Sequence, residues 1–229
     1  MGDSSEEDQD VPMKDVIGPM GLPEGVEERF NPTKNMLTVV LGTTFMHTIG
    51  IGIAFAIYSK MGSDKFDKKI EYVKEYEMGL VYLAVFIMGV LVTWLNMLPM
   101  FFKSKVFSMK SGNLRANMFV LKVNGQNGAQ YPYVVMEEEG GVGEYNRANR
   151  SMNHFVENAA GVLLAVVFAG FVFPSVTLGL VSIFAVGRVA HQIGYAVGGY
   201  GKHAPGFMLS TLSSVTLLGL VFVVAVKAI

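Results

Sequence analysis

Long stretches without a charged residue constrain this chain more than any other feature of its sequence. Residues 36–58 form a run of 23 without Asp, Glu, Lys or Arg, and residues 78–102 form a run of 25. Residues 158–201 hold a single charge, Arg188, and residues 204–226 hold none. A helix needs about 20 apolar residues to cross a bilayer core of about 30 Å. These runs predict an integral membrane protein.

Pro174 lies inside the third run and divides it, which gives five transmembrane helices in all. We place them at 36–58, 78–102, 151–173, 175–198 and 205–228. The composition agrees, because the 229-residue chain is 51% hydrophobic and 16% charged. A soluble protein would have to bury five uninterrupted apolar helices in one domain of this length, which we reject. The predicted fold class is an all-α membrane protein.

Net charge and cysteine content exclude several function classes. The formal net charge is −1, so the chain offers no electrostatic attraction for nucleic acid. It has no cysteine, which excludes disulfides, catalytic thiols and Cys-ligated metals. The four histidines are scattered and the HExxH motif is missing from the sequence, so no metal site is expected. If the protein uses a reactive thiol, a bound ligand must therefore supply it.

The polar segments divide the chain into four parts. These are an acidic disordered tail at 1–35, an extra transmembrane helix at 36–58, a polar loop at 59–77 and a four-helix domain at 78–229. The tail carries nine acids and three bases, too polar a composition to fold alone. The four-helix domain has an enlarged loop at 103–150. Asn-Gly dipeptides between short apolar stretches of this loop predict a small β-hairpin at 117–135.

Basic residues near the helix ends predict the orientation. With five spans, the tail, the loop at 103–150 and the turn at 199–204 share one side of the membrane. That side carries eleven Lys and Arg residues, and the other side carries six. The bias places the N-terminus and the long loop in the cytoplasm. We expect a multi-pass protein of the endoplasmic reticulum or another organelle membrane.

Polar residues at the start of the third predicted helix follow one helical face. Arg150 and Glu157 are seven residues apart, so they lie two turns apart on one face with His154 between them. Arg147 extends this face outward, and Asn158 follows Glu157. Charged residues are costly inside a membrane and mark functional sites or buried pairs. This stripe is the first part of the candidate site.

A second polar stripe lies on the fourth predicted helix. Its members Arg188, His191, Gln192 and Tyr195 follow the i, i+3, i+4, i+7 spacing of one face. A tight turn makes the two helices antiparallel, so both stripes lie toward the cytoplasmic side. Arginine pairs with carboxylates, glutamate with ammonium groups, and tyrosine donates to an oxyanion or thiolate, which suits a small zwitterionic or multiply anionic ligand. In the alternative interpretation, Glu157 and Arg188 form a purely structural pair.

At these stripes the sequence resembles the MAPEG family, the membrane-associated proteins of eicosanoid and glutathione metabolism. Within the family it looks closest to the microsomal glutathione transferases of the third type. The family's second helix opens with a pattern like FNxxQRAHxNxxE, to which NRSMNHFVEN at 149–158 is similar. Its third helix reads much like VGRxxYxxGY, and VGRVAHQIGY at 186–195 differs from that pattern at one place. The resemblance covers about 79–229.

The resemblance implies a fold, partners and residue roles. The fold would be a left-handed four-helix transmembrane bundle, here with one extra N-terminal transmembrane helix, assembled as a homotrimer in the lipid bilayer. Glutathione would bind between protomers as co-substrate, and its thiolate would attack a hydrophobic electrophile or a lipid hydroperoxide. The residues implied in binding are Arg150, His154, Glu157, Asn158, Arg188, His191 and Tyr195. Lys202 and Tyr195 would stabilise the thiolate.

Four departures from the family pattern keep a second hypothesis open. His154 stands where the family has Asn, His191 where it has Tyr, and Asn149 where it has Gln. The Arg that stabilises the thiolate in the family's synthases is here only Lys202 or His203, and Lys lacks the guanidinium fork. The first hypothesis is a glutathione-dependent transferase or peroxidase. The second is a non-catalytic accessory or scaffold subunit that binds other membrane subunits.

Overall fold

The computed structural model describes residues 30–106, 118–124 and 133–229. Within them the elements are α1 (Pro32–Lys60), α2 (Ser63–Glu75), α3 (Gly79–Lys103), β1 (Leu121–Asn124), β2 (Tyr133–Met136), α4 (Gly140–Val172), α5 (Pro174–Gly198) and α6 (Ala204–Ala228). Five of the described helices, all except α2, are long and apolar enough to cross a membrane. The chain is an integral, multi-pass, all-α membrane protein, as its charge-free runs predict. Residues 1–29 of the expected acidic tail lie outside the described part.

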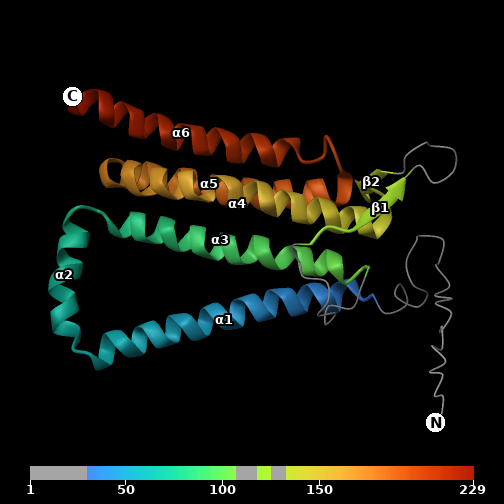
Figure 1. Cartoon of the computed structure of the whole chain (residues 1–229). Helices are drawn as coiled ribbons and strands as arrows, with labels where there is room; N and C mark the ends of the chain where they lie inside the picture. The colour runs from blue at the N-terminus through green and yellow to red at the C-terminus, as the bar shows by residue number, and fades with distance from the viewer. Residues whose placement is uncertain (1–29, 107–117, 125–132) are drawn as a thin grey trace, which may run out of the picture.

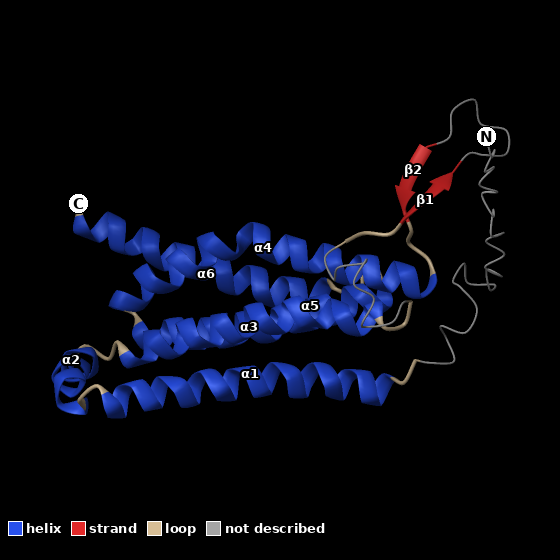
Figure 2. Cartoon of the chain, turned by 60° about the horizontal axis from the view of Figure 1, so that its bottom comes forward, coloured by secondary structure: helices blue, strands red, loops and turns tan. Residues whose placement is uncertain are grey.

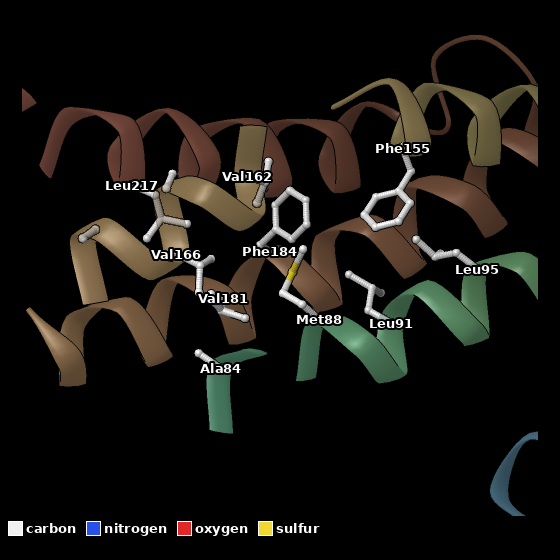
Figure 3. Close-up of a cluster of buried hydrophobic side chains, with 12 residues drawn as sticks. Ala84, Met88, Leu91, Leu95, Phe155, Val162, Val166, Val181, Phe184 and Leu217 are labelled. Carbon is white, nitrogen blue, oxygen red and sulfur yellow. The ribbon is translucent and has the colours of Figure 1, made fainter. Parts of the chain in front are cut away.

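Helices α3, α4, α5 and α6 form an up-and-down bundle (Figure 1). Their shared core is apolar and includes Met88 and Leu91 of α3, Phe155 of α4 and Phe184 of α5, which point toward one another in Figure 3. Leu217 joins this core from α6. We name the end that carries β1 and β2 the hairpin end and the opposite end the α2 end. The starts of α4 and α6 and the end of α5 meet at the hairpin end, which brings the two polar stripes together.

The extra helix α1 packs against α3 near the hairpin end and diverges from it toward α2 (Figure 1). Val39 and Thr43 are the buried residues of α1. The Asn35 side-chain amide donates to Ser104 Oγ at the end of α3, 3.1 Å away. Almost all of the remaining α1 surface is exposed and apolar. The predicted extra transmembrane helix is confirmed, and it is held mainly at one end.

Two predicted boundaries differ from the structure. The segment at 59–77, expected to be a polar loop, contains the 13-residue helix α2. Helix α4 begins at Gly140 rather than near 151, so the loop expected at 103–150 ends eleven residues earlier than predicted. In both places helical structure forms in charged sequence outside the apolar runs, as a separate helix at 63–75 and as an extension of α4 at 140–150. Charge-free runs mark where a helix can cross the bilayer, and they do not mark where the helix ends.

A small antiparallel hairpin lies beside the start of α4 (Figure 2). Strands β1 and β2 pair Leu121 with Met136, which agrees with the predicted hairpin; the connecting residues 125–132 lie outside the described part. Lys122 Nζ forms an ion pair with Glu137 at 2.9 Å. Burial raises the pKa of the Glu137 carboxyl, but hydrogen bonds from Lys122 and two backbone N–H groups outweigh it and lower the pKa below its ordinary value. The ionised carboxylate therefore fixes the base of the hairpin at neutral pH.

A proline inside α3 is compensated by a glutamine from α5. Pro99 has no N–H, so the Leu95 carbonyl loses the hydrogen bond that it would accept within the helix. The fully buried Gln192 side chain donates to this carbonyl at 3.0 Å and to the Ala148 carbonyl at 3.3 Å. Unsatisfied carbonyls are costly in lipid. Gln192, a member of the second polar stripe, therefore joins three helices rather than lining a site.

This compensation predicts a double-mutant result. We expect Gln192→Leu to lower the free energy of unfolding by about 1–2 kcal/mol, because it leaves the Leu95 carbonyl without a donor. In a Pro99→Ala background, which restores a backbone N–H at position 99, the same substitution should cost less than half as much. Thermal unfolding of the four variants in detergent measures the difference. Equal costs in the two backgrounds would contradict this role for Gln192.

Candidate functional site

A groove of about 320 Å³ lies between α4, α5 and α6. Its polar lining comes from all three helices and consists of His154, Asn158, Arg188, Ser210, Thr211 and Ser214. Its apolar lining includes Val162, Phe184 and Leu218, which lie further from the hairpin end. The groove is therefore amphipathic along its length. Residues of both predicted stripes, His154 and Asn158 of the first and Arg188 of the second, line this common cavity.

Arg188 is the dominant charge at this groove. It is only 4% exposed. One guanidinium nitrogen donates to the Ser151 carbonyl at 2.9 Å, another lies 3.2 Å from His154 Nδ1, and the group sits 5.5 Å from the centre of the Phe155 ring. Its Nε has no hydrogen-bond partner. Among the described residues, no carboxylate lies within ion-pair distance of Arg188.

Glu157 does not neutralise Arg188. It lies 3.6 Å from Arg150 on the outer face of α4, and both side chains are about half exposed, at 56% and 52%. The alternative interpretation of a structural Glu157–Arg188 pair is therefore wrong. The spacing along α4 correctly places Arg150 and Glu157 on one side of the helix, but they pair with each other, and only His154 between them contacts Arg188. An exposed ion pair of this kind is worth little energy and is free to exchange partners.

The remaining site histidine, His191, is buried and held by a serine. Ser151 Oγ and His191 Nδ1 share a hydrogen bond of 2.8 Å between α4 and α5. The imidazole is surrounded by other rings, with centroids between 5.4 and 6.1 Å away: His154, Tyr195, His203 and Phe207. No group of three His, Asp or Glu side chains in the described residues is arranged to hold a metal ion. This ring cluster forms the wall between the groove and the hairpin end.

The two predicted thiolate stabilisers lie outside the groove. Tyr195 is half-buried, and its ring stacks against His191 with centroids 6.1 Å apart. Lys202 is exposed, and its aliphatic stem covers Gly198. Neither residue lines the cavity that holds Arg188. The predicted binding residues are therefore brought together in part, because His154, Asn158 and Arg188 share the groove whereas Arg150, Glu157, Tyr195 and Lys202 surround it.

Close contact between α5 and α6 sets the width of the groove. A Cβ added to Gly187 would lie 2.7 Å from the backbone nitrogen of Ser210 and 3.0 Å from the Gly206 carbonyl. A Cβ added to Gly206 would lie 2.7 Å from the Gly187 carbonyl and overlap the backbone of His191. Glycines facing each other let two helix backbones approach in this way. This crossing brings Ser210 and Thr211 next to Arg188.

Arg147 caps the helix that carries the second stripe. Its Nε donates to the carbonyls of Tyr195 and Ala196 at 3.1 and 3.0 Å, and another guanidinium nitrogen donates to the Glu138 carbonyl at 2.6 Å. The last carbonyls of a helix lack partners within it, and a cation there also complements the helix dipole. Arg147 thus fixes the end of α5 to the start of α4. It holds the site together without lining it.

Sequence reasoning missed the contribution of α6. Ser210, Thr211 and Ser214 line the groove, and Phe207 completes the ring cluster. The pair Ser210 and Ser214 has the i, i+4 spacing of one helical face, which is the signal that could have revealed this wall. Ser151 was also missed, although it lies one residue after Arg150. Small hydroxyl residues are common in transmembrane helices, so their spacing alone does not distinguish a site from helix packing.

Comparisons with known proteins place the chain in a family. No curated protein and no solved structure matches it. A sequence model of the MAPEG family matches residues 79–225. The match begins at the start of α3 and ends near the end of α6, so it covers the four-helix bundle and excludes α1 and α2. The chain belongs to the MAPEG family.

Proposed function

We propose that the groove binds glutathione, as in a microsomal glutathione transferase or peroxidase of the third type. The observation that carries this proposal is Arg188, a buried guanidinium that faces a ligand-sized groove and has no carboxylate partner among the described residues. A buried charge without a partner costs desolvation free energy unless a ligand of opposite charge binds to it. The MAPEG family includes glutathione transferases and peroxidases. A carboxylate of glutathione is the partner that fits.

The surrounding charges suit the rest of that ligand. A carboxylate bound to Arg188 would also lie beside His154 and the hydroxyl groups of Ser210 and Thr211. Arg150 and Glu157, exposed on the adjoining strip of α4, offer one cation and one anion to the other ends of a zwitterion. In a homotrimer, this strip would meet a second copy of the chain. The thiol would then be supplied entirely by the ligand, since the protein has no cysteine.

A titration with glutathione tests this proposal. We expect the purified protein in detergent to bind glutathione saturably in calorimetry and to raise the thiolate absorbance of the bound ligand at neutral pH. S-methylglutathione is the matched control, because it keeps both carboxylates and the ammonium group but has no ionisable thiol. It should bind without the absorbance change. If neither peptide binds, the proposed function is wrong.

A second candidate is a binding but non-catalytic subunit of a larger membrane assembly. Two observations favour it: Lys202 is exposed and does not line the groove, and α1 and α2 lie outside the range that matches the family. The same titration separates the candidates. Saturable binding of glutathione without a thiolate signal indicates the non-catalytic role. A free homotrimer that binds glutathione and forms the thiolate indicates the enzyme, which would then act on a lipophilic electrophile or hydroperoxide.

A further inference from the structure

Helix α2 has an apolar face that the rest of the described chain covers only in part. Phe66, Ile70 and Val73 follow the i, i+4, i+7 spacing and so form one narrow stripe. None of the residues of α2 is buried, and Ile70 is 49% exposed. A 13-residue helix with exposed apolar side chains is marginal in water by itself. The stripe therefore requires an apolar surface beyond the described part of the chain.

The charges of α2 are ordered around this stripe. At 100° per residue, Lys69 and Lys74 fall on its two borders. The four acids Asp64, Asp67, Glu71 and Glu75 fall on the opposite half of the helix. Lysines at the border of an apolar face can lay their aliphatic stems on apolar surface and keep the ammonium group in a polar layer. Carboxylates on the far side then face water.

The position of α2 between two membrane-spanning helices indicates that it lies at the membrane surface. It begins three residues after Lys60, the last residue of α1, and ends four residues before Gly79, the first residue of α3. Both neighbours are membrane-spanning helices, so α2 lies where they leave the membrane. It runs across the direction of α1 and α3 in both views (Figures 1 and 2). A short helix held in this way lies along the bilayer surface.

Contacts with α1 set the rotation of α2. The Tyr58 hydroxyl donates to Asp67, and the rings of Tyr58 and Phe66 lie 6.2 Å apart. Phe66 and Val73 are half-buried, whereas Asp64, Lys68 and Glu71 are exposed. The apolar stripe is therefore on the side of the transmembrane helices. Exposed tyrosines nearby, Tyr72, Tyr76 and Tyr82, are typical of the layer where lipid headgroups meet water.

We propose that α2 is a membrane-surface helix that inserts Phe66, Ile70 and Val73 among the headgroups and upper acyl chains of the lipid. The helix carries four lysines and four acids, so its own charge is balanced and its binding does not require anionic lipid. The partner is a zwitterionic phospholipid surface. Insertion of this face stabilises the wide connection between α1 and α3, and it does so independently of whatever the groove binds.

The natural lack of cysteine makes a direct test possible. The single substitutions Phe66→Cys, Ile70→Cys and Val73→Cys are made, with Glu71→Cys and Glu75→Cys as matched controls on the other side of the same helix. Each full-length variant is spin-labelled in phosphatidylcholine nanodiscs. The accessibility of the label to oxygen, which concentrates in lipid, and to a water-soluble nickel chelate is then measured.

The expected result is a periodic pattern. Labels at 66, 70 and 73 should show high oxygen and low nickel accessibility, and labels at 71 and 75 should show the reverse, by a factor of about three or more. High nickel accessibility at all five positions would mean that α2 lies in water. Low accessibility to both reagents at 66, 70 and 73 would mean that protein covers the stripe. Either result overturns the proposal, and thermal unfolding of each variant confirms that the labelled chain is folded.

Discussion

The substitution Gly206→Val is expected to separate α6 from α5 and to destabilise the bundle strongly. A side chain at Gly206 would overlap the backbone of His191 and lie 2.7 Å from the Gly187 carbonyl. Backbone atoms cannot move aside as a flexible side chain can. Overpacking against them costs about 3 kcal/mol or more. We expect a large fall in the Tm measured by circular dichroism in detergent.

Gly219 provides the matched control on the same helix. A Cβ added there would meet nothing within 4 Å, and Gly219 is exposed. Gly219→Val should therefore leave the Tm within about a degree or raise it slightly, since valine replaces a weak helix former on an apolar surface. Similar melting temperatures for the two variants would show that α5 and α6 do not meet at Gly187 and Gly206. Because this crossing forms one wall of the groove, Gly206→Val should also abolish ligand binding.

The substitution Arg188→Leu is expected to change binding and stability in opposite directions. The affinity for glutathione should fall about 10- to 100-fold, since hydrogen bonds to a charged group contribute about 1.5–3 kcal/mol. The Tm of the ligand-free protein should stay the same or rise, because leucine removes a buried charge that has no carboxylate partner in the described chain. Calorimetry and thermal unfolding on the same samples measure the two effects.

A lower affinity for glutathione together with an unchanged or higher Tm distinguishes a binding residue from a structural one. If Arg188 served only the packing of α4 against α5, its removal would lower the Tm and leave any glutathione binding to the folded fraction unchanged. Lys227→Leu is the control for loss of one positive charge. Lys227 is exposed at the end of α6, at the opposite end of the molecule from the hairpin. It should alter neither the affinity for glutathione nor the Tm by a measurable amount.

The sequence predicts the membrane-spanning helices well because a long run without charged residues is what a helix surrounded by lipid requires. It also predicts that Arg188 and His154 lie close together, since their two helices are antiparallel and joined by a tight turn. It fails for Glu157, because helical spacing identifies residues that share a face and does not tell which neighbour that face meets. It fails for Ser210 and Thr211 for the same reason. The wall that α6 contributes depends on the approach of Gly187 to Gly206, which is a property of the packed bundle.

The divergence of α1 from α3 leaves the apolar run of α1 with few protein neighbours along most of its length. The charge-free run at 36–58 has 23 residues. At a rise of 1.5 Å per residue it is about 34 Å long, whereas the hydrocarbon layer is about 30 Å thick. A helix whose apolar run exceeds the hydrocarbon thickness tilts, so that its apolar ends do not protrude among the lipid headgroups. Because α1 is held near α3 at the hairpin end and diverges from it at the other, its tilt can adjust to the thickness of the host membrane while α2 spans the gap.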